Sequence, residues 1–525
     1  MRRTAFHLPA LVSLTLLSLA ATTAGAAQQP DVLLRGGTIV DGTGAPARTG
    51  DVAITGDRIT FVGDAARARV TARRVIDARG LFVAPGFIDP HTHTLEDLRD
   101  ASRDRRQNAG YLMQGVTTVI AGNDGGGPLE VGETLDRFAR DSIGTNAALY
   151  VGFGSVRSKV LGMSSSAADD AQLARMRAMV AKGMDDGALG LSTGLYYAPQ
   201  SYSSTEEVVA LAREAASRGG VYDSHLRDES SYTVGLVGAV AEALLIGREG
   251  GLPVHIAHVK ALGTDVWGRS DTVIAMVRAA RAGGQKVTAD QYPYTASGTG
   301  VGAALLPRWA EAGGRDSLRS RATNPEYRDR LYAAMRDNMR RRGGAAALLI
   351  TDRGRPELVG KTLDDIARQR NADPVLTAIE IILGGDASVA SFNMQEDDIA
   401  RFMREPWVFT GSDGSSGHPR KFGTYPRKLR RYVLTQRVLT LEEMVRRSSG
   451  DVADALGIGD RGRLAAGMLA DVIVLDTAAV AERATYEAPE RLAEGMRYVF
   501  VNGAAVVDEG KLTGRLPGRA IRRKQ

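Results

Sequence analysis

The sequence has no cysteine among its 525 residues, and this absence excludes several kinds of chemistry. Without thiols the chain has no disulfides, no thiolate nucleophile and no thiolate ligand for a metal ion. Any metal site must use histidine, aspartate, glutamate or a modified lysine. Stability must come from the hydrophobic core, for which 43% hydrophobic residues are an ordinary supply.

Apolar runs long enough to cross a membrane are absent after the first 27 residues. Segment 1–27 begins with Arg2 and Arg3, continues with an apolar run over 8–21, and ends with the small residues Ala24-Gly25-Ala26. This is the pattern of a cleaved secretory signal peptide, with Sec-type export as the default expectation. We therefore predict a periplasmic or secreted protein that has no stable membrane insertion after cleavage.

The chain also lacks a strong charge of one sign. Its formal net charge is +6, and removal of Arg2 and Arg3 with the signal peptide leaves +4. The basic clusters at 336–342, 427–431 and 519–524 contain no interleaved aromatic residues, so they indicate solvated surface rather than a nucleic-acid interface. The expected partner is a small-molecule substrate, with no nucleic acid.

Through the middle of the chain, apolar segments alternate with helix-like segments. Helical patterns are clearest over 171–182, over 205–218 with Thr205 as a cap, and over 271–282. This alternation is typical of an α/β fold of the (β/α)₈ TIM-barrel type, and an open doubly wound sheet is the alternative. We predict eight barrel strands, over residues 82–90, 116–122, 147–153, 187–193, 220–225, 253–258, 286–291 and 407–412.

The two ends of the chain instead carry short alternating strands separated by Gly and Asp turns. Neither end is long enough for a stable β-domain, so we predict that both build one small β-sandwich. The gap before the eighth barrel strand is too long for a loop. The predicted domains are a β-sandwich from 28–84 and 466–525, a barrel over 85–465, and a subdomain inserted near the barrel mouth over about 300–405.

Histidines and aspartates follow the predicted barrel strands. His91 and His93 stand at i and i+2, so both side chains point to the same face of an extended strand. His255 faces away from His258 and is interpreted as a core or supporting group, and His418 lies in a loop. Because barrel strands end at one common mouth, we expect a metal site there from His91, His93, Asp124, His225, His258 and Asp413.

Four imidazoles and two carboxylates suit one or two divalent ions, with Zn²⁺ as the first choice. Such an ion lowers the pKa of a water molecule and polarises a substrate carbonyl. A carboxylate that is not fully committed to the metal can move a proton from the water to the leaving amine. We assign this catalytic role to Asp413.

The order of these features resembles the metal-dependent amidohydrolase superfamily, and several motifs resemble its D-aminoacylase (N-acyl-D-amino-acid deacylase) branch. The likeness covers nearly the whole chain after the signal peptide. The motifs that carry it are Gly115-Val116-Thr117-Thr118-Val119, Gly122-Asn123-Asp124-Gly125, Gly194-Leu195-Tyr196-Tyr197-Ala198-Pro199, His225-Leu226-Arg227-Asp228-Glu229, His258-Val259-Lys260, Tyr292-Pro293-Tyr294-Thr295-Ala296, and Gly411-Ser412-Asp413-Gly414 with His418-Pro419-Arg420.

The resemblance implies two metal positions that share Asp124, the second of them usually the tighter one in this branch. Their further ligands would be His91, His93 and Asp413 at the first, and His225 and His258 at the second. It also implies that Tyr197, Lys260 and Ser297 hold the free carboxylate of the substrate or nearby polar groups. The alternatives for these three are simple packing, a structural ion pair and a turn residue, in that order. Arg227 and Arg420 are further carboxylate-binding candidates, with structural ion pairing as the alternative for each.

One position departs from the branch, which usually has cysteine where this chain has Asp124. Aspartate is a harder ligand than a thiolate and offers two oxygens. It can bridge two ions, but it changes the metal preference. Mn²⁺ and Co²⁺ are therefore alternatives to Zn²⁺ here.

These features predict an exported metal-dependent amidohydrolase. Its substrates would be N-acyl-D-amino acids, or short peptides with a C-terminal D-residue as a dipeptidase would cleave. A cyclic-amide or lactone hydrolase on the same barrel is the alternative enzyme. A periplasmic binding protein is the alternative that is not an enzyme. The sequence does not indicate an oligomeric state.

Overall fold

The computed structural model describes residue 1 and residues 29–523. Apart from residue 1, the predicted signal peptide at 1–27 lies outside these described residues. Within the described part of the chain, no helix combines the length and the apolar character that crossing a bilayer requires.

The centre of the molecule is a barrel of parallel strands, as predicted. Two hydrogen-bonded groups, β6-β7-β8 and β9-β10-β11-β12-β13-β17, make up its wall. They are continuous because only Tyr150 separates β8 from β9. The strands are β6 Phe87–Thr92, β7 Val116–Ala121, β8 Asn146–Leu149, β9 Val151–Gly152, β10 Gly190–Gly194, β11 Val221–His225, β12 Val254–Ile256, β13 Val287–Gln291 and β17 Val408–Thr410.

The barrel closes between β6 and the end of β17. The backbone N–H of Asp413 donates to the His91 carbonyl at 2.9 Å, and Thr92 and Gly414 form a parallel bridge. The backbone N–H of Ser412 also donates to the buried Asp89 carboxylate at 3.0 Å. The first and last barrel strands are therefore joined, which excludes the open doubly wound sheet.

Helices cover the outside of the barrel, and their sequence patterns explain where they begin. Helix α7 starts after Ser204, whose side chain caps it by accepting from the Glu207 N–H at 3.2 Å. The capping residue is therefore Ser204, one residue before the predicted Thr205. The surrounding helices include α4 Val131–Asp141, α6 Asp170–Asp185, α7 Thr205–Ala216, α8 Gly235–Gly250, α9 Ser270–Ala282, α15 Glu396–Arg404, α17 Leu441–Arg447 and α18 Gly450–Ala455.

Strands from both ends of the chain form one nine-stranded sheet. The two ends meet where β5 pairs antiparallel with β18, with Val83 opposite Val474. Side chains from both ends, including Leu34 and Phe500, share one core. The strands are β1 Val32–Ile39, β2 Arg48–Thr55, β3 Arg58–Gly63, β4 Arg74–Asp77, β5 Phe82–Pro85, β18 Val472–Leu475, β19 Met496–Val501, β20 Ala504–Asp508 and β21 Lys511–Leu512.

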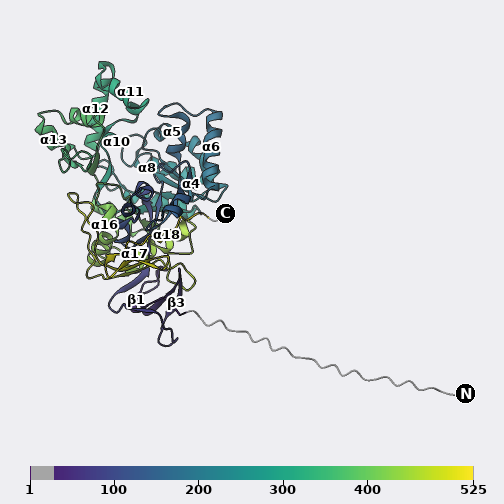
Figure 1. Ribbon diagram of the computed structural model, residues 1–525. Helices are drawn as coiled ribbons and strands as arrows, with labels where there is room; N and C mark the ends of the chain where they lie inside the picture. The colour runs from purple at the N-terminus through teal and green to yellow at the C-terminus, as the bar shows by residue number, and fades with distance from the viewer. Residues whose placement is uncertain (2–28, 524–525) are drawn as a thin grey trace.

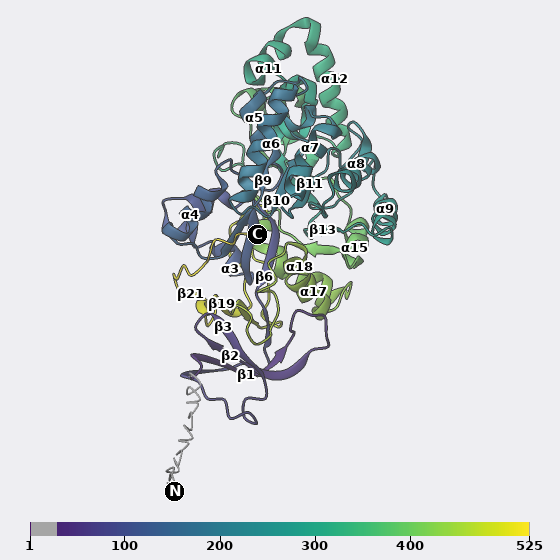
Figure 2. The ribbon, with the colours of Figure 1, turned by 90° about the vertical axis from the view of Figure 1, so that its right-hand side faces the viewer.

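An insertion with its own hydrophobic core lies at the end of the molecule opposite to β1 and β3 (Figures 1 and 2). Its three strands form an antiparallel sheet in the order β14-β16-β15. The next helix, α15, packs on α9 and β17 of the barrel. The elements of the insertion are β14 Ala296–Gly300, α10 Val301–Leu305, α11 Gly314–Thr323, α12 Pro325–Arg341, β15 Leu348–Ile350, α13 Leu363–Gln369, α14 Pro374–Leu383 and β16 Ser388–Phe392.

Candidate metal centre

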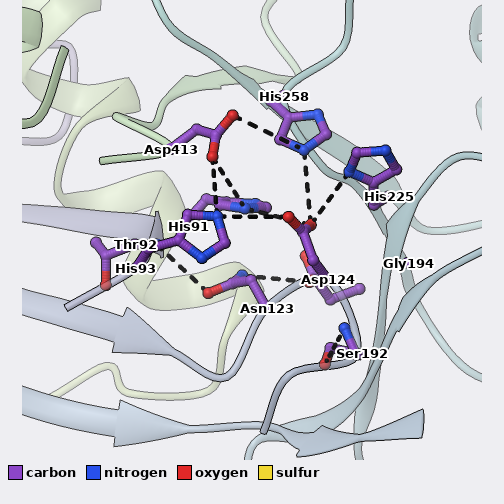
Figure 3. A network of polar contacts seen from close by, with 12 residues as sticks. His91, Thr92, His93, Asn123, Asp124, Ser192, Gly194, His225, His258 and Asp413 are labelled. Atoms are coloured by element: carbon purple, nitrogen blue, oxygen red, sulfur yellow. Dashed lines mark hydrogen bonds and ion pairs between the residues drawn. The ribbon is translucent and has the colours of Figure 1, made fainter. Parts of the chain in front are cut away.

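The six side chains predicted as metal ligands converge at the mouth of the barrel (Figure 3). They come from the ends of five strands or from the first residues after them, because the carboxyl ends of parallel strands open at one side. The six residues and their strands are His91 in β6 and His93 just after it, Asp124 after β7, His225 at the end of β11, His258 after β12 and Asp413 after β17.

The Asp124 carboxylate lies at the centre of this group (Figure 3). Its Oδ1 is 3.4 Å from His91 Nε2, 3.4 Å from His225 Nδ1 and 3.6 Å from His258 Nε2. Its Oδ2 is 3.4 Å from His93 Nε2. One carboxylate thus faces four imidazoles, which is the position of a bridging ligand.

The ligand atoms divide into two groups that share Asp124. In each group the atoms lie within 4.8 Å of one another. Asp413 belongs to the first group, where its Oδ1 is 3.0 Å from His93 Nε2. The groups are His91, His93, Asp124 and Asp413 on one side, and Asp124, His225 and His258 on the other.

Two observations indicate that divalent cations fit these groups. His91 Nε2, His225 Nδ1 and Asp124 Oδ1 are fully buried and have no hydrogen-bond partner, although buried polar atoms are nearly always paired. Two ligands that each lie about 2.1 Å from a tetrahedral ion are also about 3.4 Å apart, which matches the spacing around Asp124. A nitrogen and carboxylate donor set of this kind suits zinc.

Three of the ligands stand on left-handed backbone. The φ angles are 56° at Asp124, 33° at His258 and 47° at Asp413. Residues other than glycine adopt this region at a cost of about 1–3 kcal/mol each, and such residues concentrate at functional sites. The strained turns aim the three side chains into the mouth instead of along the strand.

The charges at the centre are strongly coupled. Burial alone would raise the pKa of the Asp124 carboxyl, but the charges of His91 and His225 hold it well below its usual range. For His93, burial alone would lower the pKa of the imidazole, but Asp124 and Asp413 raise it to about 9. The carboxylates therefore attract positive charge, and a bound cation would displace protons from the imidazoles.

Glu229 is a functional residue that the sequence analysis did not assign. Its carboxylate accepts from Lys260 Nζ at 2.5 Å and lies 3.1 Å from His258 Nδ1 and 4.0 Å from His225 Nε2. Carboxylates in this position fix the ring orientation of ligand histidines. The only sequence signal was its place four residues after His225, within a loop motif.

A second set of buried groups supports His91 from inside the barrel. His91 Nδ1 lies 3.8 Å from Asp290 Oδ2, and His255 Nε2 lies 2.9 Å from the same oxygen. Burial alone would raise the pKa of Asp290, but the hydrogen bond with His255 and the charge of His91 lower it. His255 therefore acts as a supporting group and not as a metal ligand.

Four of the five predicted substrate-binding residues line one cavity of about 350 Å³ beside the ligands. These are Tyr197, Lys260, Ser297 and Arg420. Arg227 does not line this cavity. Its guanidinium pairs with Glu242 at 2.8 Å and borders a neighbouring cavity of about 450 Å³. The prediction that Arg227 binds the substrate is therefore replaced by its alternative. Arg227 forms a structural ion pair, because its side chain turns toward Glu242 of α8.

Arg420 is fully buried and bonded to the candidate catalytic residue. Its Nη1 is 2.8 Å from Asp413 Oδ2, and its guanidinium lies 4.6 Å from the centre of the Tyr292 ring. Burial would raise the pKa of Asp413, but Arg420 and His258 hold it well below its usual range. Asp413 is therefore ionised, and Arg420 fixes the orientation of its carboxylate.

Comparison with known proteins agrees with this geometry. Residues 74–507 match the Amidohydrolase family. The chain is 34% identical to a D-aminoacylase of Alcaligenes xylosoxydans xylosoxydans, over 94% of this chain and 98% of the relative. A D-aminoacylase structure described as having a binuclear metal centre aligns with a TM-score of 0.80 and 34% identity, over 94% of this chain and all of that one.

A second solved structure is an N-acyl-D-glutamate deacylase from Bordetella bronchiseptica, complexed with zinc and a phosphonate inhibitor. It aligns with a TM-score of 0.80 and 32% identity, over 94% of this chain and all of that one. The chain belongs to the amidohydrolase family and, within it, to the D-aminoacylase branch. The resemblance, the barrel fold and the expectation of a divalent-metal centre are confirmed.

Proposed function

We propose that this protein is a zinc-dependent hydrolase of linear amide bonds whose amine side is a D-amino acid. The substrates are N-acyl-D-amino acids or short peptides with a C-terminal D-residue. The observation that carries this proposal is the shared Asp124 carboxylate, which faces four imidazoles at the barrel mouth. The names of the relatives support the D-configuration of the amino acid.

A bound divalent cation supplies an activated water and a polarised acyl carbonyl. The chain supplies the proton transfer. Asp413 accepts the proton of the attacking water at a carboxylate oxygen and delivers it to the amide nitrogen as the C–N bond breaks. Arg420 holds Asp413 in place at 2.8 Å during both transfers.

The free carboxylate of the substrate binds among the polar groups that border the metal ligands. Lys260 and Arg420 supply positive charge, and Tyr197 and Ser297 supply hydroxyl groups, in the same cavity as Asp413. A carboxylate prefers such donors because hydrogen bonds between charged groups are shorter and stronger than neutral ones. This arrangement fixes the orientation of the amide against the metal centre.

One experiment tests the whole proposal. Purified protein is analysed for Zn, Mn and Co, and then assayed with N-acetyl-D-amino acids, their L-enantiomers, L,D-dipeptides and a cyclic amide. We expect bound zinc and hydrolysis of the D-series only, with the dipeptides separating a deacylase from a dipeptidase. Preferential turnover of the L-series or of the cyclic amide would contradict the proposal.

We also propose that the protein acts in the periplasm or outside the cell, and the features of segment 1–27 support this location. Fractionation of the producing cell, with sequencing of the mature N-terminus, tests it. Cleavage near Ala26 in the exported fraction is the expected result, and an intact N-terminus in the cytoplasm would contradict it.

A further inference from the structure

Arg342 is a buried cation in the substrate cavity that the chemistry above does not use. It follows α12 at the edge of the insertion, and only 3% of the residue is exposed. It lines the same cavity as His225 and Asp413. The insertion thus places a permanent positive charge beside the metal centre.

The contacts of Arg342 are all with neutral groups. Its Nε donates to the Ala304 carbonyl at 3.1 Å, and its Nη2 to the Tyr196 hydroxyl at 3.3 Å. Its guanidinium also lies 5.8 Å from the centre of the Tyr232 ring. Among the residues that the structure describes, no carboxylate lies within 4.0 Å of the Arg342 guanidinium, whereas Lys260 pairs with Glu229 and Arg420 with Asp413.

A buried arginine without a counter-charge requires an explanation. Buried charges are usually paired, because removal of an ion from water costs several kcal/mol. A buried lysine can avoid this cost by losing its proton, but the guanidinium of arginine stays charged. The guanidinium of Arg342 is therefore available to pair with an anion that enters the cavity from solution.

The charge balance of the cavity agrees with an anionic ligand. Three cationic side chains (Lys260, Arg342 and Arg420) face three carboxylates (Asp124, Glu229 and Asp413). These charges cancel, so any divalent cation bound at the centre would leave positive charge in excess. An anionic ligand would neutralise part of this excess, and a ligand with two carboxylates would neutralise more of it than a ligand with one.

The position of Arg342 shows which part of a ligand can reach it. The Tyr196 ring lies between the metal centre and Arg342, with its centroid 6.0 Å from that of His225 and its hydroxyl bonded to Arg342. A group bound at Arg342 is therefore separated from His225 by the Tyr196 side chain. This is where a substituent of the substrate would project, and not its reacting amide.

We propose that Arg342 binds a second carboxylate of the substrate and makes the protein selective for dicarboxylic N-acyl-D-amino acids. The inference rests on the proposed function and narrows its substrate class. The second carboxylate belongs either to an acidic D-side chain or to a dicarboxylic acyl group. Similarity does not decide the side chain, because the D-aminoacylase and the N-acyl-D-glutamate deacylase are 34% and 32% identical to this chain.

Pairs of substrates with nearly the same shape test the inference. N-acetyl-D-glutamate is compared with N-acetyl-D-glutamine for the side chain, and N-succinyl-D-leucine with N-pentanoyl-D-leucine for the acyl group. In at least one pair, we expect kcat/KM to be at least about tenfold higher for the charged member, since charge-assisted bonds at a buried site discriminate strongly. The pair that shows the preference identifies the source of the second carboxylate.

Variants then assign the preference to Arg342. In Arg342→Met the ratio of kcat/KM between charged and neutral members should fall to near one, and Arg342→Lys should keep part of it. Arg340→Met is the matched control, because Arg340 is exposed and pairs with Asp265 outside the cavity. The control should keep the wild-type ratio.

A binding measurement gives a readout besides turnover. Calorimetric titration of the metal-loaded protein with D-glutamate and D-glutamine, and with succinate and butyrate, should show tighter binding of the charged ligand of one pair. Arg342→Met should lose this difference.

The outcomes are distinguishable. If N-acyl-D-amino acids are hydrolysed but both pairs show equal kcat/KM and equal affinities, the inference fails while the proposed function stands. If no N-acyl-D-amino acid is hydrolysed, the proposed function fails and the inference falls with it. If Arg342→Met does not fold, the wild-type ratios still decide the inference.

Discussion

Asp413 has a different contact at each of its carboxylate oxygens. Oδ1 lies 3.0 Å from His93 Nε2, and Oδ2 lies 2.8 Å from Arg420 Nη1. Asparagine keeps the shape of this side chain but cannot accept a proton at neutral pH. We expect Asp413→Asn to lower kcat by about 10²–10⁴-fold, the usual contribution of a general base, in an assay with the best N-acyl-D-amino acid.

A matched control separates this effect from a general loss of structure. Asp397 is exposed and forms no ion pair among the described residues, so Asp397→Asn should keep the wild-type kcat. Asp397→Asn should unfold at the wild-type denaturant concentration, and Asp413→Asn, which leaves the buried Arg420 without its partner, should unfold at a lower concentration but remain folded under the assay conditions. A kcat for Asp413→Asn within threefold of wild type would remove Asp413 from the proton transfer.

Lys428 makes a residue-scale prediction about pH. Its ammonium is buried and donates to Thr410 Oγ1 at 2.9 Å, and burial, reinforced by the nearby Arg447, lowers its pKa from 10.5 to about 7. Unfolding returns Lys428 to water and restores its ordinary pKa. Unfolding therefore takes up a proton between pH 7 and 10.5, and this group makes the free energy of unfolding rise with pH across that window.

We expect Lys428→Met to remove this rise and to increase the free energy of unfolding near pH 7. The pKa difference corresponds to a few kcal/mol, with roughly 5 as an upper value. Urea unfolding at pH 7 and pH 9 measures both effects. Lys286→Met, at an exposed position, is the control. If the free energy of unfolding of Lys428→Met rose with pH as in the wild-type protein, the lowered pKa of Lys428 would not be the cause of the rise.

The ability of the sequence to predict the site depended on where each residue stands. His225 and Asp413 could be predicted because each follows an apolar strand, and barrel geometry brings strand ends together. Glu229 lies in a loop, where no periodic pattern indicates its contacts with Lys260 and His258. Arg342 belongs to the basic cluster over 336–342 that was interpreted as solvated surface, but the packing of the insertion on the barrel buries it. Arg227 was misplaced because two residues of loop turn its side chain toward Glu242.

At the scale of elements, the last residue of β10 limits the turn that carries Asp124. A Cβ atom added at Gly194 would lie 3.0 Å from the carbonyl carbon of Asp124 and 3.1 Å from the Tyr197 ring. The backbone at Asp124 cannot retreat easily, because it already has left-handed φ. We expect Gly194→Ala to shift this turn and to lower metal affinity by about tenfold or more, as misplacement of a ligand does.

Metal analysis after dialysis against a weak chelator measures this effect. Gly459→Ala is the control, since an added Cβ there meets no atom within 4 Å and the glycine does not have left-handed φ. The control should retain the wild-type metal content. A wild-type metal content in Gly194→Ala would contradict this prediction, because it would show that the turn at Asp124 can shift without moving the carboxylate.

Elements were easier to predict than their junctions. Helix α9 spans Ser270–Ala282, within one residue of the predicted 271–282, because its apolar pattern is a local signal. The interruption between β8 and β9 at Tyr150 had no local signal, since all neighbouring residues are apolar. Tyr150 still bonds to β7 there, since its backbone N–H donates to the Ala121 carbonyl at 3.0 Å.

For the whole molecule, the metal centre connects strands that lie far apart in the sequence. A ligand that binds only the folded state stabilises it by mass action, by about 2.7 kcal/mol at a hundredfold excess over Kd. We expect chelation to lower the Tm measured by calorimetry, and added zinc to restore it. In Asp124→Ala, metal content and this difference in Tm should both fall. A Tm that is independent of metal in the wild-type protein would contradict this.

The joining of both chain ends in one domain could be predicted, because neither end has enough strands to be stable alone. The strand that pairs with β5 could not be predicted. Strand β5 meets β18 because the barrel brings residues 85 and 472 to the same side, and Val472 pairs with Pro85. Local sequence carries no information about such a distant register.

The pairing of β5 with β18 has a consequence for biosynthesis. Strands β1–β5 are made first, but their sheet cannot be completed until residues 472–512, near the end of the chain, have been synthesised. Until then β5 presents an unpaired edge, which is a template for association with other chains. Ribosome stalling or premature termination before residue 472 should therefore yield aggregation-prone chains, and C-terminal truncation should reduce soluble yield more than deletion of an internal surface loop.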